Sequence, residues 1–320
     1  MNCLSIVIPV YNAVDFIVDR LTALLAHLPE TVEIVIVDDG STDESLELCN
    51  TILKGRSNTC IIHQENQGLS CARNRGIKSA HGEFILFLDC DDCLVVGSIP
   101  PILELLEKSQ FDVLMGKYLL STSAGIRPST KYFFRNTCNE PLLYIYRDLP
   151  DIIWNAWRYI CRKSFIIEYS LWFKPGIYCE DVEWTPRMLE SATSICFWDE
   201  PFYIYYHRPG SITKSVNFKK TLDLNHTIVN YLQKYSGNIY SPFLFSRLIR
   251  ESFYSISDYC FFSEEERGIL RDIICSIAFY YNKYGSSLAK LFVNSQPFIP
   301  IVLWSWMLAG VKRLHHFINY

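Results

Sequence analysis

An acidic cluster follows a short apolar run near the end of the first hundred residues. Asp89, Asp91 and Asp92 come directly after residues 84–88, which read FILFL. Carboxylate oxygens are the ligands that hard cations such as Mg²⁺ and Mn²⁺ prefer, and Mg²⁺ sites usually combine one or two carboxylates with substrate phosphates. The cluster therefore predicts a divalent metal site that is completed by a diphosphate.

The same cluster contains the spacing C-x-x-C, at Cys90 and Cys93, which also occurs in redox and zinc sites. No second C-x-x-C pair and no H-x-x-x-H pair accompanies it in the sequence. We therefore interpret the spacing as a coincidence. The twelve cysteines are expected to be reduced, mostly structural thiols, because they are scattered through a long chain.

The elements that must position these residues alternate between strand and helix. Four short apolar runs are typical of buried strands, and the segments between them have helical spacing or a helix-start signal. The expected strands are residues 4–10, 32–37, 60–63 and 84–88; the expected helices are residues 14–28, a segment starting at a capping box at residues 41–44, and residues 70–79. Strands joined by single helices run parallel, so we predict an α/β fold with a mostly parallel sheet that is covered on both faces.

Polar residues follow each of the four expected strands, at residues 11–12, 38–41, 65–68 and 89–92. Ligands of open α/β sheets bind at the carboxyl ends of the strands. Carboxylates gathered at one edge repel one another unless a cation or a hydrogen-bonding ligand joins them. Aspartate and glycine also favour turns, which would account for any single loop. Four consecutive strand ends favour a ligand site.

Composition and missing motifs remove several classes of protein. The net charge of -4, the pI near 6.0 and the lack of a Lys/Arg-rich run argue against nucleic-acid binding. The sequence has neither the G-x-x-x-x-G-K-[ST] motif of a P-loop NTPase nor the G-x-G-x-x-G motif of a dinucleotide oxidoreductase after its first strand. The remaining possibility is a protein that holds a nucleotide through a metal ion on a parallel sheet without either of these phosphate-binding motifs.

Four segments, in order, resemble the successive motifs of family 2 glycosyltransferases. They are SIVIPVYN at residues 5–12, VDDGSTD at 37–43, GLSCARNRG at 68–76 and FLDCDD at 87–92. Each is weak alone, whereas the ordered set is a strong signal. The resemblance covers residues 1–215 and implies the GT-A fold and transfer of a sugar from a nucleotide donor.

The resemblance also implies roles for residues at the strand ends. Pro9 and Tyr11 would line the nucleobase pocket, with the Tyr11 ring as a stacking surface. The alternative for Tyr11 is an ordinary core aromatic. Asp39 would accept a hydrogen bond from a base N–H, typically of uracil.

The same resemblance implies that Asp91 binds Mn²⁺ or Mg²⁺ and that Asp89 faces the ribose or the metal. Arg73 or Arg75 would meet the diphosphate, but only one of them, because residues two apart on a helix do not share a face. The residues expected to bind the nucleotide sugar are Pro9, Tyr11, Asn12, Asp39, Asn66, Arg73, Asp89 and Asp91, with Asp92 as a supporting carboxylate.

A transferase also needs a group that removes the proton from the attacking hydroxyl. GIYCEDVEW at residues 176–184 resembles the family's E-D motif. This implies that Asp181 is the general base of a single inverting displacement and that Glu180 supports it. An acidic pair alone is more often a solvated turn. Its place between Trp-Asn at residues 154–155 and EPFYIYYHRPGSIT at residues 200–213, both similar to family segments, favours the catalytic interpretation.

His207 and Arg208 lie in the last of these segments. Neutral imidazole is a usable Mn²⁺ ligand, so His207 would complete the metal shell or touch the diphosphate, with a structural histidine as the alternative. Arg208 would supply the phosphate contact instead. Many relatives have a lysine after the Trp-Asn pair, where this chain has Ala156, which implies a different substrate contact here.

From residue 217 onward the motifs end and the pattern becomes helical with dense aromatics, including a capped helix start at residues 263–266. We predict a glycosyltransferase domain at residues 1–215, with a nucleotide-binding half at 1–95 and an acceptor half at 96–215, and a helical C-terminal region at 216–320. Residues 297–311 are apolar but too short to span a membrane. With the basic border up to residue 316, this segment either contacts a membrane peripherally or packs on the protein core.

The predicted activity is that of a metal-dependent inverting glycosyltransferase. It would move a hexosyl or N-acetylhexosaminyl group from a UDP-sugar to a hydroxyl of a glycan or lipid-linked acceptor in surface polysaccharide biosynthesis. The start at Met1 lacks the features of a secretory signal, so a cytoplasmic place, with peripheral contact to the inner face of the membrane, is expected. The alternatives are a nucleotide-sugar-binding protein without catalysis, a membrane-associated scaffold, and a nucleotidyltransferase, which would need a basic phosphate loop after the first strand.

Overall fold

The computed structural model describes residues 3–108, 110–129, 140–149, 153–207, 216–235 and 237–286. The chain divides into two compact units: unit 1 is Met1–Asn139 with Asp151–Arg208, and unit 2 is Glu140–Pro150 with Pro209–Tyr320. Within the described ranges, no helix is long and apolar enough to cross a membrane. Arg208 and the segment at residues 297–316 lie outside the described residues.

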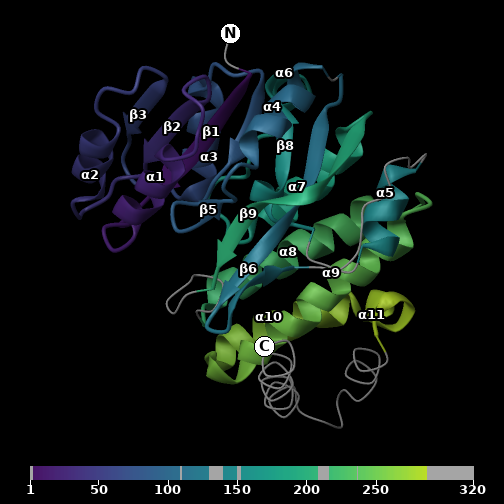
Figure 1. The fold of residues 1–320 in the computed structure, drawn as a ribbon. Coiled ribbons are helices and arrows are strands. Elements are labelled where there is room, and N and C mark those ends of the chain that lie inside the picture. The colour runs from purple at the N-terminus through teal and green to yellow at the C-terminus, as the bar shows by residue number, and fades with distance from the viewer. Residues whose placement is uncertain are drawn as a thin grey trace. The chain divides into compact units, whose positions relative to one another are not determined.

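Unit 1 is built on a mixed sheet, which confirms the α/β class (Figure 1). Within the described part of the chain the sheet has nine strands in the order β3-β2-β1-β4-β8-β6-β9-β5, with β7 paired to β6. The first four strands run parallel, as predicted, whereas β8 joins β4 in antiparallel orientation. The strands are β1 Leu4–Val10, β2 Glu33–Asp38, β3 Thr59–His63, β4 Phe84–Phe87, β5 Cys93–Leu94, β6 Val113–Thr122, β7 Gly125–Pro128, β8 Tyr159–Arg162 and β9 Ile195–Tyr206.

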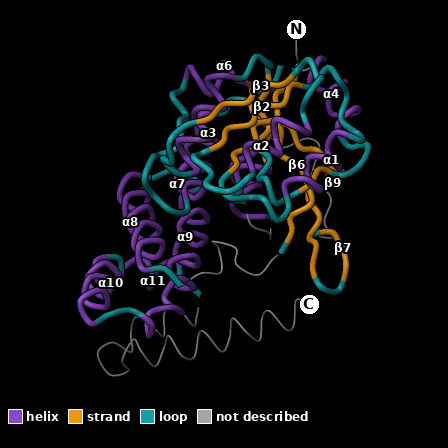
Figure 2. The backbone as a smooth tube through the Cα atoms, turned by 90° about the vertical axis from the view of Figure 1, so that its left-hand side faces the viewer, coloured by secondary structure: helices purple, strands orange, loops and turns teal. Residues whose placement is uncertain are grey.

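Helices cover both faces of this sheet, as the sequence predicts (Figure 2). Alternate residues of β1 point to opposite faces. Leu4, Ile6 and Ile8 pack in one core with residues of α1, α2 and α4, whereas Val7 lies against α3. The helical segments of unit 1 are α1 Ile17–Leu25, α2 Ser45–Ile52, α3 Leu69–Ser79, α4 Ile99–Glu107, the 3₁₀ turn Ala156–Arg158, α6 Lys163–Glu168 and α7 Glu180–Ser191.

The predicted capping box at residues 41–44 is wrong. The helix begins four residues later, at Ser45, and the Ser41 hydroxyl accepts a hydrogen bond from the Asn12 backbone N–H instead. At the start of this helix it is Asp43 that binds a free backbone N–H: its Oδ1 accepts a hydrogen bond from the Ser45 N–H at 3.0 Å. A contact to the neighbouring strand end therefore outweighs the local capping pattern.

The described segments of unit 2 are mainly helical. Its segments are α5 Pro141–Leu143, the π-helical turn Tyr144–Asp148, α8 Phe218–Lys234, α9 Ser241–Ser255, the 3₁₀ helix Ile256–Phe261, α10 Glu264–Ser276 and α11 Ala278–Tyr284. Asn217 caps α8, and the capping box predicted for Ser263 and Glu266 is present at α10. The Arg247 guanidinium of α9 donates to the carbonyl oxygens of Tyr146 and Leu149, which ties the π-helical turn to α9.

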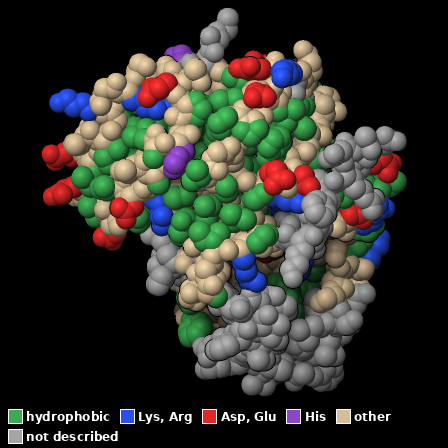
Figure 3. Space-filling view, viewed as in Figure 1, with side chains coloured by type: hydrophobic (Ala, Val, Ile, Leu, Met, Phe, Trp, Pro, Cys, Tyr) green, Lys and Arg blue, Asp and Glu red, His purple; other side chains and the backbone are tan. Residues whose placement is uncertain are grey.

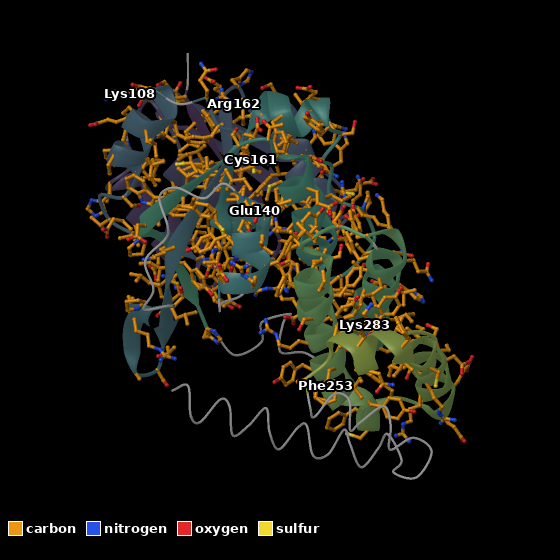
Figure 4. The ribbon with its side chains drawn as sticks, turned by 90° about the vertical axis from the view of Figure 1, so that its right-hand side faces the viewer. Lys108, Glu140, Cys161, Arg162, Phe253 and Lys283 are labelled. Carbon is orange, nitrogen blue, oxygen red and sulfur yellow. The ribbon has the colours of Figure 1, made fainter. Side chains whose placement is uncertain are left out.

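The described cysteines are all free thiols, in agreement with the expectation from the sequence. Cys161 lies on β8 in the interior of unit 1, and burial raises the pKa of its thiol well above the ordinary value (Figure 4). At the end of the same strand, Arg162 pairs with Glu83 and lies over the Phe84 ring. On the face drawn in Figure 3, the Lys and Arg side chains are scattered and form no continuous basic patch, and several of them lie beside Asp or Glu.

Candidate functional site

The end of β1 is tied to the loop after β2 through Asn12. Its backbone is left-handed, with φ 48°, a conformation that asparagine tolerates better than most residues. Asn12 Oδ1 accepts a hydrogen bond from the Thr42 backbone N–H at 2.8 Å. The neighbouring Tyr11 is 50% exposed, so its ring lies at the surface and not in the core. Pro9 is buried within β1.

The Asp39 carboxylate, after β2, organises the loop between β3 and α3. Its Oδ1 accepts from Gln64 Nε2 at 2.7 Å and from the Gln67 N–H at 3.0 Å, and its Oδ2 accepts from the Gly68 N–H at 2.8 Å. Asp39 is 4% exposed, and Asn66 lies exposed in the loop that it holds. A carboxylate offers about four lone-pair sites, so three protein donors leave room for a further N–H.

Asp92, the last residue of the acidic turn, joins this turn to β9. Its carboxylate accepts from the Tyr203 hydroxyl at 2.7 Å and from the Tyr206 N–H at 2.8 Å, and the side chain is buried. Burial, together with the charges of Asp89 and Asp91, raises the pKa of Asp92 to about 8. Asp92 therefore supports the turn, while Asp89 and Asp91 remain partly exposed.

Arg73 of α3 lies between two carboxylates that are far apart in the sequence. Its Nη2 is 2.9 Å from Asp89 Oδ1 and its Nη1 is 2.6 Å from Glu180 Oε1, with the guanidinium 3% exposed. Burial lowers the pKa of Arg73, but the two carboxylates outweigh it and raise the pKa above its ordinary value. Arg75 lies on the exposed side of α3, so only one of the two arginines faces the site.

Asp181 is in the first turn of α7, directly after Glu180. The helix begins at Glu180, and the N-cap residue before it, Cys179, has a left-handed backbone with φ 57°. The helix dipole stabilises carboxylates at this end. Burial, followed by the neighbouring charge of Glu180, raises the pKa of Asp181 to about 7, while Arg73 opposes the increase. A carboxyl group that titrates near neutral pH suits proton transfer.

Arg20 of α1 is a site residue that the sequence analysis missed. Its Nε donates to the Asp91 carbonyl oxygen at 3.1 Å, and its guanidinium lies 3.8 Å from the centre of the Tyr206 ring. His207 follows Tyr206, and its ring packs edge-on against Tyr205 at 5.0 Å. Arg20 and Asp92 therefore both fix the end of β9 beside the acidic turn.

Ala156, the position after the Trp-Asn pair, is 1% exposed, beside the buried Trp154 and Trp157. A small side chain fits this packed position. The 3₁₀ turn before β8 therefore presents no cation at residue 156.

The residues at the acidic turn fit a cation that is shared with a diphosphate. No group of three or more His, Cys, Asp and Glu side chains that could hold a metal occurs in the described ranges. Two partly exposed carboxylates, Asp89 and Asp91, lie on one turn, and one of them pairs with Arg73. Sites that use one or two carboxylates and complete the shell with substrate phosphates are characteristic of Mg²⁺.

The fold is shared with solved structures of GT-A type. Staphylococcus aureus TarS residues 1–349, in complex with UDP-GlcNAc, matches with a TM-score of 0.68 at 18% identity, over 98% of this chain and 92% of that chain. A mannosyltransferase, PcManGT from Pyrobaculum calidifontis, in complex with GDP-Man and Mn²⁺, matches with a TM-score of 0.57 at 14% identity, over 98% of this chain and 87% of that chain.

The chain belongs to the family described as Glycosyl transferase family 2, whose sequence model matches residues 5–163. It is similar to the uncharacterized glycosyltransferase EpsJ of Bacillus subtilis, with 31% identity over 226 residues, which are 68% of this chain and 65% of EpsJ. It is also similar to the glycosyltransferase GlyG of Streptococcus pneumoniae, with 29% identity over 66% of this chain and 73% of GlyG. The resemblance found in the sequence is thereby confirmed.

Proposed function

We propose that this chain is an inverting glycosyltransferase that moves a hexosyl or N-acetylhexosaminyl group from a UDP-sugar to a hydroxyl of a glycan or lipid-linked acceptor. The observation that carries the proposal is the chain of contacts Asp89–Arg73–Glu180, because it joins the acidic turn to the start of α7, where Asp181 follows Glu180. The acidic turn, where the nucleotide-sugar donor would bind, is thus joined to Asp181, a carboxyl group whose pKa is raised to about 7.

In this proposal Asp181 is the general base. Its ionised carboxylate accepts the proton of the acceptor hydroxyl as the hydroxyl oxygen attacks the anomeric carbon, and the bond to the leaving diphosphate breaks in the same displacement. One base and one displacement invert the configuration at that carbon. Glu180 and Arg73 hold Asp181 in position, and the Glu180 charge keeps its pKa high enough for proton transfer.

The donor side uses the ends of β1, β2 and β4. Tyr11 presents an exposed ring on which a base can stack, and Asp39 has capacity for a base N–H. Asp89 and Asp91, with His207 at the end of β9 and with Arg208, the next residue in the sequence, would hold Mn²⁺ or Mg²⁺ and the diphosphate. The metal would supply positive charge to the leaving group.

The UDP-GlcNAc complex of TarS supports uracil as the base and an N-acetylhexosamine as one candidate sugar for this chain. We place donor binding in residues 1–95, acceptor binding in residues 96–215 and partner contacts in residues 216–320. Residues 297–316 would bring the enzyme to the inner face of the cell membrane, where surface polysaccharides are built on lipid-linked acceptors.

The test is a transfer and hydrolysis screen over UDP-, GDP- and dTDP-sugars with Mn²⁺, with the wild-type chain and Asp181→Asn side by side. We expect turnover of a UDP-sugar by the wild type, an inverted anomeric configuration of the product by NMR, and loss of turnover in Asp181→Asn with UDP binding retained. Donor binding without turnover by the wild type would identify a binding protein instead. Turnover retained by Asp181→Asn would remove Asp181 as the base.

A further inference from the structure

Residues 171–173, between α6 and α7, are held by a side chain of α3. The Asn74 carboxamide donates from Nδ2 to the Phe173 carbonyl oxygen at 2.8 Å and accepts at Oδ1 from the Phe173 N–H at 2.9 Å. One side chain thus satisfies both backbone groups of one residue, as a neighbouring strand would. An Asn74 side chain lacking either the donor or the acceptor loses one of these bonds.

The same three residues are fixed to α7 on their other side. The Trp184 indole N–H donates to the Leu171 carbonyl oxygen at 2.8 Å, and the Phe173 ring stacks on the Trp184 ring at 4.6 Å and 15°. Arg187 Nη2 donates to the Trp172 carbonyl oxygen at 2.8 Å. Because Trp184 and Phe173 are fully buried, displacement of residues 171–173 has to move α7 with them.

Asn74 and Arg73 are consecutive in α3, yet they reach two different points of the segment that carries the base. Arg73 binds Glu180 directly, at the first turn of α7. Asn74 binds Phe173, which packs against the second turn through Trp184. Two separated points of attachment restrict rotation of α7 as well as translation, which a single ion pair does not.

We propose that Asn74 is a positioning residue for the general base: it sets the place of Asp181 relative to the acidic turn through Phe173 and Trp184. The inference rests on the proposed function, since it concerns the same base. It concerns placement only, because the carboxamide is occupied by the Phe173 backbone on both of its ends. Misplacement of a catalytic group by about 1 Å costs about 100-fold in rate, so the effect belongs in kcat.

The test compares Asn74→Ala and Asn74→Asp, alone and combined with Asp181→Asn. Asn74→Asp keeps the volume and the acceptor but loses the donor to Phe173, so it is the second variant if Asn74→Ala is poorly folded. Asn50→Ala is the matched control, because Asn50 is an exposed asparagine of α2 whose Nδ2 donates only to its own helix, at Leu46 O. Circular dichroism sets a temperature at which every variant is folded, and UDP binding with Mn²⁺ is measured by calorimetry.

We expect kcat to fall by about 10- to 100-fold in both Asn74 variants, with the Kd for UDP within about threefold of the wild type and Asn50→Ala unchanged. The Asn74 substitutions should not lower the residual turnover of Asp181→Asn any further, since there is no base left to misplace. A folded Asn74→Asp with wild-type kcat, or losses that add in the double variant, would overturn the inference. Activity retained by Asp181→Asn alone would instead overturn the proposed function, so the two failures are distinct.

Discussion

The Asp39 carboxylate accepts a hydrogen bond from the Gly68 backbone N–H at 2.8 Å, which joins the end of β2 to the start of α3. Asp39 also accepts from Gln64 and Gln67, so one buried side chain fixes the whole loop between β3 and α3. Two of the four polar strand ends are therefore connected before any ligand binds. Arg73 and Asn74 lie about one turn after the start of α3, so this loop also helps to fix the position of both side chains in the site.

Asp39→Asn should destabilise the protein and weaken UDP binding together. An amide NH₂ in place of one acceptor oxygen meets a donor N–H, and a lost charge-assisted bond in a buried site costs about 1–3 kcal/mol. Urea denaturation at pH 7 measures the first effect and calorimetry with UDP the second. Asp15→Asn, at an exposed position of the first loop, is the control and should leave both quantities unchanged. An Asp39→Asn protein with wild-type stability would show that the three donors do not depend on the charge.

Gly76→Ala should destabilise unit 1 by about 1–3 kcal/mol, because overpacking a buried contact forces side chains or backbone to shift. A Cβ at Gly76 would lie 2.2 Å from Cγ1 of Val7, so α3 would have to move away from β1. Gly268→Ala, within α10, is the matched control: apart from its chain neighbours and its own helix backbone, no atom lies within 4 Å of its added Cβ. An alanine inside a helix should stabilise by about 0.5–1 kcal/mol there. Equal effects at the two positions in thermal denaturation would refute the close approach.

The parallel half of the sheet was predictable because each strand is a short apolar run and each crossover is a single helix. Local patterns contain that information, and the parallel direction of β1, β2 and β4 follows from the order of elements. The helix start at residue 45 was not predictable, since Ser41 is engaged by Asn12, a residue 29 positions away. The antiparallel addition of β8 to β4 likewise depends on packing between distant segments.

The residues of the candidate site also fall into those that the sequence predicts and those whose role depends on contacts between distant segments. Asp89, Asp91 and Asp181 stand in motifs that a reader of the sequence can see. The contacts of Arg20, Asn74 and Tyr203 cannot be predicted in this way, although Asn74 and Tyr203 also stand in motif segments, because their partners lie 71, 99 and 111 residues away. Local sequence also does not tell that Asp92 is the buried member of the acidic turn, which follows from its contact with Tyr203.

Tyr11→Ala should weaken UDP binding by about 1–3 kcal/mol, the range for loss of an aromatic surface on which a base stacks. Because Tyr11 is half exposed, the substitution removes little packing, and the melting temperature should hardly change. Tyr169→Ala, at a tyrosine that is 44% exposed after α6, controls for loss of a surface ring. If the two variants bind UDP equally well, the base does not stack on Tyr11.

Chelation with EDTA should stop transfer, and Mn²⁺ or Mg²⁺ should restore it. Asp91→Asn should raise the metal concentration needed for half-maximal activity by at least about tenfold, since it removes one of two carboxylates that a diphosphate-bound cation would use. Asp15→Asn again serves as the control for loss of one surface charge. Full activity in EDTA, with metal-free buffers verified by elemental analysis, would exclude the metal role.

Transfer should depend on pH through Asp181. Its pKa is raised to about 7, and only the ionised carboxylate accepts the hydroxyl proton, so kcat should increase with pH below 7 and level off above it. Arg73→Gln removes the group that lowers this pKa, so the rise should move to higher pH; Glu180→Gln removes a charge that raises it, so the rise should move to lower pH. Glu168→Gln, at an exposed position of α6, should leave the profile in place. Because the two substitutions flank the same carboxyl group and act in opposite directions, a general loss of structure does not reproduce the pattern. Shifts of the same sign in Arg73→Gln and Glu180→Gln would show that a group other than Asp181 controls the rate.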